Sequence, residues 1–135
     1  QIVQDFKSQH IDAVAAVEAR GFIFGSILAH ELNCSFIPVR KAGKLPFTSR
    51  SKRYYLEYGS ASIEMHVDAV KPAARVLIHD DLLATGGTAC AAGELIRELG
   101  GTVAGFSFLI NLGFLPGAQN ITNRFGVIPH YLVSY

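Results

Sequence analysis

Short apolar runs alternate with helical patterns along most of this chain. Period-2 and continuous apolar runs predict strands at 11–17, 34–39, 75–79, 103–110 and 127–133. Apolar residues at helical spacing predict helices at 1–10, 22–32 and 87–99. A polar loop at 43–53 leads into an alternating pattern at 54–67 around Gly59-Ser60, which predicts a β-hairpin. Strands that alternate with helices indicate an α/β fold, a mostly parallel sheet covered by helices on both faces.

Length and composition favour one packed domain spanning 1–135. Half of the 135 residues are apolar and only 17% are charged, which is typical of a globular core. The longest uncharged stretch lies between Glu98 and Arg124. Because it contains several glycines and Pro116, we interpret it as a buried strand followed by turns rather than a membrane span.

Charge and cysteine usage narrow the possible partners and the compartment. The formal net charge of +1 gives no overall attraction to nucleic acid or to a membrane surface. Cys34 and Cys90 lie far apart and outside any C-x-x-C motif. Neither a disulfide framework nor a zinc site is indicated, and we interpret both cysteines as small buried apolar residues in a cytoplasmic protein.

Two adjacent carboxylates, Asp80 and Asp81, follow the predicted strand at 75–79 and precede a Gly-rich turn at 84–88. At the carboxyl edge of a parallel sheet they are placed to meet ribose hydroxyls or a metal. The turn can present main-chain N–H groups to a phosphate, and the following helix adds its dipole. The alternative is a strand end whose acids merely cap the next helix. No Gly-Lys-Ser/Thr follows, so this is not a nucleotide P-loop.

Two further polar segments follow strand ends. Residues 18–21, Glu-Ala-Arg-Gly, end the first strand and can hold a diphosphate through Arg20 and main-chain amides, or form a plain turn with a surface ion pair. Half of all Lys and Arg residues fall within 40–53, with no acid among them. For Arg50, Lys52 and Arg53, a solvated basic loop is as good an explanation as a binding role.

These segments together resemble the type I phosphoribosyltransferase family, and within it the adenine phosphoribosyltransferases. The residues that carry the resemblance are Glu18–Gly25, Val39–Pro46, Leu56–Gly59 and the motif Val76–Thr88. Their order and spacing match over nearly the whole chain. The resemblance implies a type I fold with a flexible β-hairpin at about 45–67. It also implies an N-terminal hood that forms part of the base pocket, which we expect to be absent from this sequence.

The resemblance also implies an activity in purine salvage: phosphoribosyl pyrophosphate (PRPP) and adenine give AMP and pyrophosphate. Arg20, Asp80, Asp81 and Glu57 become the expected catalytic residues, Glu57 as acid/base on the mobile loop. The expected substrate-binding residues are Ala19, Arg20, Arg40, Lys41, Lys44, Tyr58, Asp80, Asp81, Leu83, Ala84, Thr85, Gly86, Gly87 and Thr88. A non-proline cis peptide is expected beside Arg20. Mg²⁺ is expected as cofactor, bound mainly through PRPP and also through Asp80 or Asp81, in a homodimeric enzyme.

Several alternatives remain open from the sequence. The base could be hypoxanthine, guanine or xanthine. The chain could instead be a PRPP-sensing regulator that binds nucleic acid, although its near-neutral charge and Glu57 argue against this. It could also be an inactive fragment or have disordered termini. His79 stands where the family usually has an apolar residue, and we interpret it as a buried neutral imidazole bonded to its neighbours rather than a catalytic group.

Overall fold

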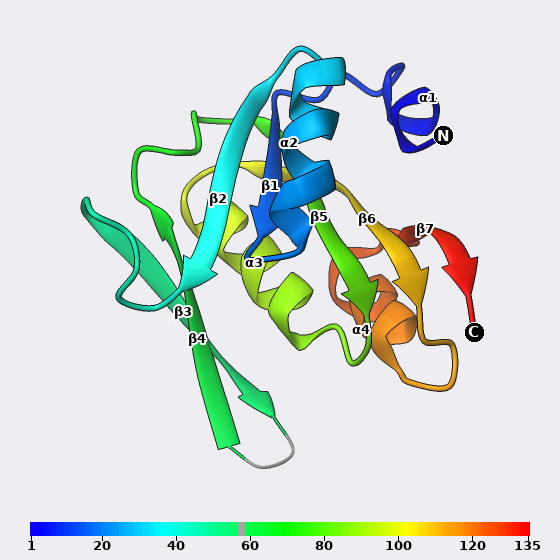
Figure 1. Cartoon of the computed structure of the whole chain (residues 1–135). Helices are drawn as coiled ribbons and strands as arrows, with labels where there is room; N and C mark the ends of the chain where they lie inside the picture. Colours follow the sequence, from blue (N-terminus) through cyan, green and yellow to red (C-terminus); the bar gives the residue numbers. More distant parts are fainter. Residues whose placement is uncertain (57–58) are drawn as a thin grey trace.

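The computed structural model describes residues 1–56 and 59–135. In these residues helices and strands alternate as the pattern predicted (Figure 1). The elements in chain order are α1 (Ile2–Phe6), β1 (Ala13–Val17), α2 (Gly21–Glu31), β2 (Ser35–Lys41), β3 (Ser49–Leu56), β4 (Gly59–His66), β5 (Arg75–Leu83), α3 (Gly87–Glu98), β6 (Thr102–Asn111), α4 (Gly117–Phe125) and β7 (His130–Ser134).

The strands form one sheet in the order β3-β4-β2-β1-β5-β6-β7. Strands β2, β1, β5, β6 and β7 are parallel to one another, whereas β3 and β4 form an antiparallel hairpin. The hairpin joins β2 through the pairs Arg40–Glu64 and Lys41–Ile63. From β1 the chain moves outward to β2, and from β5 it moves the other way to β6 and β7. The order therefore reverses between β1 and β5, and ligands of open α/β sheets bind at such a reversal.

The helices cover both faces of the sheet (Figure 1). Because right-handed connections lead in opposite directions from β1 and β5, α2 lies on one face and α3 lies on the other with α4. On the α1–α2 side, Phe6 and Leu28 pack against Val14 and Leu77. The larger core lies on the other side, where α3 and α4 cover the opposite faces of β1, β5 and β6. Each central strand is thus buried on both faces, which explains why it reads as a continuous apolar run.

The structure corrects several of the predicted element boundaries. Residues 49–53, expected in a loop, form the first half of β3, and β5 continues through Asp80 and Asp81 to Leu83 instead of ending at 79. Helix α4 replaces the turns expected after β6, and α1 covers only part of the predicted helix at 1–10. In the part of the chain that the structure describes, no helix is long and apolar enough to cross a membrane.

Candidate functional site

The reversal of strand order places two polar segments side by side. Glu18, Ala19 and Arg20 follow β1, and together with Asp80 and Asp81 near the end of β5 they line a cavity of about 350 Å³. Arg20 Nε lies 2.6 Å from Asp81 Oδ2 and joins the two segments. The peptide bond between Glu18 and Ala19 is cis, as the resemblance implied.

Asp80 is the more confined of the two adjacent carboxylates. Its Oδ1 accepts the Asp81 N–H at 2.8 Å, and a Cβ added at Gly21 would lie 3.1 Å from the same oxygen. The first turn of α2 therefore approaches β5 as closely as a glycine allows. Burial, assisted by the neighbouring charge of Asp81, raises the pKa of Asp80 well above its ordinary value. This carboxylate is consequently suited to accept positive charge or hydroxyl donors from a ligand.

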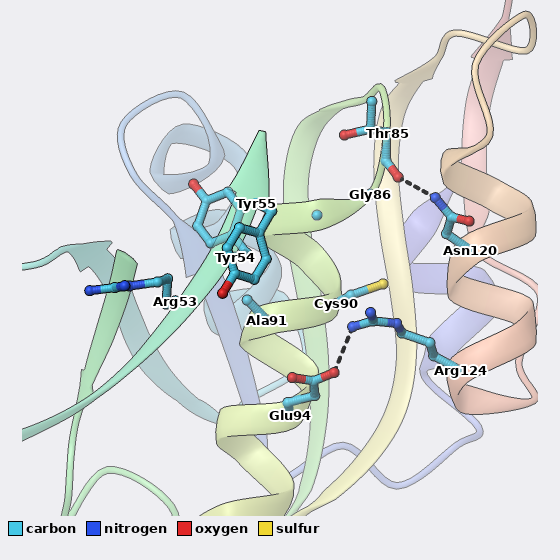
Figure 2. Close-up of a pocket in the computed structure, with 11 residues that line it drawn as sticks. Arg53, Tyr54, Tyr55, Thr85, Gly86, Cys90, Ala91, Glu94, Asn120 and Arg124 are labelled. Carbon is cyan, nitrogen blue, oxygen red and sulfur yellow. Dashed lines mark hydrogen bonds and ion pairs between the residues drawn. The ribbon is translucent and has the colours of Figure 1, made fainter. Parts of the chain in front are cut away.

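The Gly-rich turn between β5 and α3 has a fixed shape. Gly86 has φ +81°, a left-handed conformation that favours glycine, and it forms the N-cap of α3. Asn120 Nδ2 of α4 donates to the Thr85 carbonyl at 2.9 Å and braces the turn from the other side (Figure 2). The first N–H groups of α3 have no partner within the helix, so they are available to a phosphate.

A cavity of about 460 Å³ adjoins this turn between the hairpin, α3 and α4 (Figure 2). Thr85, Gly86 and Gly87 form its edge, and Tyr54 of β3 lies beside them. A Cβ added at Gly87 would lie 3.3 Å from the Tyr54 ring. The hairpin therefore packs directly on the turn through Tyr54.

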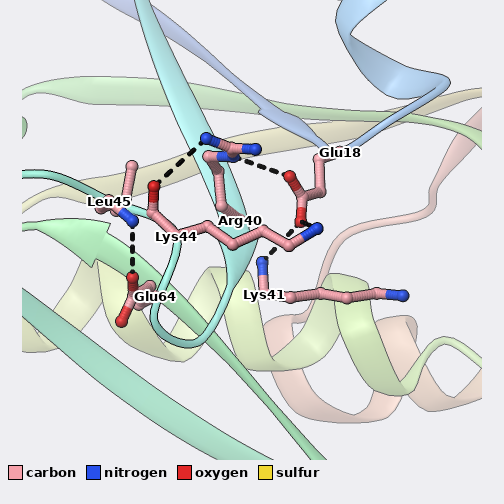
Figure 3. A network of polar contacts seen from close by, with 6 residues as sticks. All are labelled: Glu18, Arg40, Lys41, Lys44, Leu45 and Glu64. Carbon is pink, nitrogen blue, oxygen red and sulfur yellow. Dashed lines mark hydrogen bonds and ion pairs between the residues drawn. The ribbon is translucent and has the colours of Figure 1, made fainter.

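The basic loop, residues 40–48, is held by two buried carboxylates (Figure 3). Glu18 accepts hydrogen bonds from Arg40 Nε at 2.7 Å and the Lys41 N–H at 3.0 Å, and Lys44 Nζ lies 3.2 Å away. Glu64 of β4 accepts the Leu45 N–H at 3.0 Å. One carboxylate thus binds mainly the side chains of the loop, whereas the other binds its main chain.

Hydrogen bonding decides the ionisation of Glu18. Burial alone would raise its pKa, but hydrogen bonds from Arg40, Lys41 and Lys44 outweigh burial and lower the pKa to about 2. Glu18 is therefore ionised at neutral pH.

The structure brings most of the predicted site residues to one edge of the sheet. Ala19, Arg20, Asp80 and Asp81 line the cavity at the strand reversal. Arg40, Lys41, Asp80 and Thr88 line a smaller cavity of about 120 Å³ next to it. Gly87 and Thr88 begin α3 directly after the turn. Glu57 and Tyr58 lie outside the described residues, so their predicted roles stay predictions.

Two sets of predicted residues have different surroundings from those expected. The Leu83 side chain is 1% exposed and belongs to the core, so only its main chain could reach a ligand, whereas Leu82 lines the cavity with Asp80 and Asp81. Lys52, considered as part of a solvated loop, forms ion pairs with Glu94 and Glu98 of α3 at 3.3 and 2.8 Å. Lys52 therefore attaches the hairpin to α3.

Sequence reasoning gave no role to Glu18, Glu64 or Tyr54. Glu64 follows Ile63 in an alternating strand, and alternation predicts that one of two neighbours faces solvent. Ile63, Glu64 and Met65 are all buried, because the basic loop folds over the face that alternation assigns to water. The one signal in the sequence is that the basic loop contains no acid of its own. Its cations and N–H groups therefore need carboxylates from elsewhere in the chain, such as Glu18 and Glu64.

His79 is buried as predicted. Its Nδ1 lies 2.9 Å from Ser107 Oγ, and burial lowers its pKa to about 4. It lies on the α2 side of the sheet, where its ring is within 3.7 Å of a Cβ added at Gly25. Of the two cysteines, Cys90 is buried as expected, but Cys34 is only half-buried.

The arrangement suits a ligand that carries several phosphates and a sugar. Cations from Arg20 and the basic loop face acids at the strand reversal, and a phosphate-binding turn adjoins them. Among residues 1–56 and 59–135, no group of three or more His, Cys, Asp or Glu side chains could hold a metal by itself. Asp80 and Asp81 fit Mg²⁺ only in the manner usual for phosphate substrates, with one or two carboxylates and the remaining ligands from substrate and water.

Comparisons with known proteins agree with this geometry. Residues 1–114 match the phosphoribosyl transferase domain. The adenine phosphoribosyltransferase of Sorangium cellulosum is 55% identical over 93% of this chain, and that of Nitrosococcus oceani is 52% identical over the whole of this chain. The chain spans 62% and 77% of the lengths of these two relatives.

A solved structure gives the same result at the level of the fold. The crystal structure of adenine phosphoribosyltransferase from Rhodothermus marinus superimposes with a TM-score of 0.94 at 46% identity. The match covers 99% of this chain and 75% of that one.

Proposed function

Because this chain belongs to the phosphoribosyltransferase family, and within it to the adenine phosphoribosyltransferases, we propose that it transfers the phosphoribosyl group of PRPP to adenine. The products are AMP and pyrophosphate, and the role is purine salvage. The observation that carries the proposal is the meeting of Arg20 with Asp81 at the strand reversal, beside the basic loop and the Gly-rich turn. The identity of the base rests on membership of the family rather than on residues of this site.

The proposed reaction breaks the bond between C1 of the ribose and the pyrophosphate oxygen. Positive charge develops on the ribose, as in glycoside cleavage. The carboxylates of Asp80 and Asp81 bind the 2′- and 3′-hydroxyls and favour this charge electrostatically. Arg20, Arg40, Lys41 and Lys44 compensate the charge that develops on pyrophosphate as it leaves.

The 5′-phosphate provides the binding energy that orients the reacting carbon. Main-chain N–H groups of residues 84–88 and the hydroxyls of Thr85 and Thr88 bind it in this proposal. The phosphate is remote from C1, so its contacts position the ribose without taking part in bond breaking. The bracing of the turn by Asn120 and the left-handed Gly86 supports this role, because both fix the turn before a ligand binds.

Mg²⁺ belongs to the proposal as the cofactor that PRPP brings. Asp80 or Asp81 would supply its protein ligand, and the remaining ligands would be PRPP oxygens and water. When bound, the ion neutralises charge on the leaving pyrophosphate. The pKa of Asp80 supports this role. Burial raises the pKa of this half-buried side chain, and a bound cation would favour its ionised form.

Glu57 completes the proposal as the acid/base that serves the imidazole nitrogens of adenine, with Tyr58 beside it in the substrate-binding loop. The support is the matched segment Leu56–Gly59, which runs in the sequence from the last residue of β3 to the first residue of β4. A loop that closes over the site would exclude water and protect the reactive ribose from hydrolysis.

The assay that tests the proposal measures PRPP-dependent release of pyrophosphate with adenine, hypoxanthine, guanine and xanthine in parallel. We expect activity with adenine only and a requirement for Mg²⁺. Activity with another base would assign the chain to that base instead. Tight PRPP binding without turnover on any base would favour the regulator.

Two broader expectations belong to the proposal. We propose a homodimer, supported by Ile23, Phe24 and Ile27, which expose 62%, 47% and 50% of their surface along one side of α2. We also propose a cytoplasmic location, supported by two cysteines that are both free in the structure.

A further inference from the structure

Glu18 is the carboxylate on which both cationic side chains of the basic loop that form ion pairs converge. The loop side chains Arg40 and Lys44 and the main-chain N–H of Lys41 all converge on its two oxygens. Arg40 also donates from Nη1 to the Lys44 carbonyl at 3.2 Å, which closes the cluster (Figure 3). The Lys41 side chain, in contrast, extends away from Glu18 in the same view.

The members of this cluster differ in how far they are buried. The Glu18 side chain is 8% exposed, whereas Arg40 and Lys44 are 35% and 51% exposed. The carboxylate is therefore shielded, and both cations extend from it toward solvent, Arg40 also lining the smaller cavity beside the strand reversal. Its lowered pKa, about 2, agrees with a permanent charge at this position.

The charges around the site are nearly balanced. Four cations that we assign to pyrophosphate, Arg20, Arg40, Lys41 and Lys44, face three carboxylates, Glu18, Asp80 and Asp81. Asp81 is already paired with Arg20 and Glu18 with Arg40 and Lys44. Only Lys41 has no side-chain ion pair among the described residues of this group. Pyrophosphate must therefore compete with the protein's own acids for its cations.

We infer that Glu18 is an internal anion that holds Arg40 and Lys44 in position before pyrophosphate binds and competes with it for these cations afterwards. The inference rests on the proposed function, because it assumes that the basic loop binds pyrophosphate. In this role Glu18 is a positioning residue and does not touch the reacting atoms. Binding of pyrophosphate draws Lys44 and the outer face of Arg40 toward the ligand at the expense of part of their contact with Glu18.

This competition has a purpose in the reaction. A leaving group with several charges needs strong compensation while the bond breaks, yet the same compensation slows its departure as product. A carboxylate fixed behind the cations holds their side chains in the binding conformation before the ligand arrives. It also limits how tightly these cations retain the product. Glu18 therefore lowers the affinity for pyrophosphate while it keeps the side chains of Arg40 and Lys44 in fixed positions.

The test is the affinity for free pyrophosphate of Glu18→Gln, measured with Mg²⁺ by isothermal titration calorimetry and as product inhibition. Glutamine keeps the size of the side chain and one acceptor but removes the charge. We expect pyrophosphate to bind about tenfold tighter, because one compensating unit charge near two partly exposed cations is lost. Inhibition by pyrophosphate should strengthen by the same factor. Glu18→Asp, which keeps the charge, should restore weak binding.

A matched control removes one negative charge elsewhere. Glu31 is exposed at the far end of α2, distant from the site. The variant Glu31→Gln should therefore leave the pyrophosphate affinity unchanged. Unchanged or weaker binding in Glu18→Gln would overturn the inference and leave Glu18 a purely structural contact. Failure of the proposed function is separate, because it would appear as wild-type protein that neither turns over PRPP nor binds pyrophosphate.

Discussion

At the scale of single residues, function and stability separate most clearly at the Arg20–Asp81 pair. The two side chains are 71% and 25% exposed, and their atoms are 2.6 Å apart. Exposed ion pairs contribute roughly 0–1 kcal/mol to folding. The fold therefore gains little from this pair, and its position at the strand reversal indicates that its importance lies in ligand binding.

We accordingly expect Asp81→Asn and Arg20→Ala to lower kcat/KM for PRPP by at least about 100-fold, since each removes a charge that the transition state needs. The unfolding free energy should fall by no more than about 1 kcal/mol. Steady-state kinetics and urea unfolding measure the two quantities. Near wild-type turnover in either variant would refute the assignment of these residues.

At the scale of elements, β4 shows how one buried acid organises a loop. Burial alone would raise the pKa of Glu64, but hydrogen bonds from the main-chain N–H groups of Leu45 and Gly43 and from the Ser49 hydroxyl outweigh it and lower the pKa. Glu64 is 6% exposed and no cation pairs with it among the described residues. The ionised carboxylate is stabilised by loop dipoles, so the loop and the strand depend on one another.

Glu64→Gln should destabilise the protein at pH 7 by about 2 kcal/mol, the usual cost of losing hydrogen bonds to a buried charge. Because folding lowers the pKa of Glu64, its contribution is complete above its unfolded value of about 4.5 and is lost as the pH falls below it. The difference from wild type should therefore shrink in urea unfolding at acidic pH.

The control for this effect is Glu98→Gln. It removes an exposed carboxylate whose ion pair with Lys52 lies on the surface of α3. Its cost should stay under about 1 kcal/mol. An equal loss in both variants would mean that Glu64 has no special part in holding the basic loop.

The elements also show what the sequence could predict. Strands buried on both faces, such as β1 and β5, were recognised because their apolar runs are continuous, and the acids beyond them identified the edge where ligands bind. Helix α4 was missed because its residues favour turns and Ile121 is the one large apolar side chain among its two buried residues. Ala118, Ile121 and Phe125 are nevertheless spaced as on one helix face, and Pro116 and Gly126 flank the segment as start and stop signals.

The site shows the same division. Arg20, Asp80 and Asp81 were predictable because each follows a continuous apolar run and the topology joins the carboxyl ends of the strands. Glu18 and Glu64 were not, because their partners are contributed by a loop that approaches only after folding. Long-range contacts of this kind leave no local pattern in the chain.

At the scale of the whole molecule, one face of α2 is left uncovered by the residues that the structure describes. Ile23, Phe24 and Ile27 are exposed there, and Leu132 and Val133 of β7 line the same apolar groove with Phe24 and Ile27. A continuous apolar surface of this kind is typical of a protein–protein interface. Since α2 begins directly after Arg20, a partner on this face would also fix the start of the helix beside the site.

We therefore expect the wild-type protein to sediment as a dimer and Ile27→Lys to shift it toward the monomer in analytical ultracentrifugation, because a charge in an apolar interface loses its hydration without a partner. Ile128→Lys supplies the control, since Ile128 is 85% exposed and outside this groove. It should leave the mass unchanged. A wild-type monomer, or a dimer that Ile27→Lys does not weaken, would exclude α2 as the interface. A loss of PRPP turnover together with the dimer would further indicate that assembly orders the segment from Glu18 to Gly21.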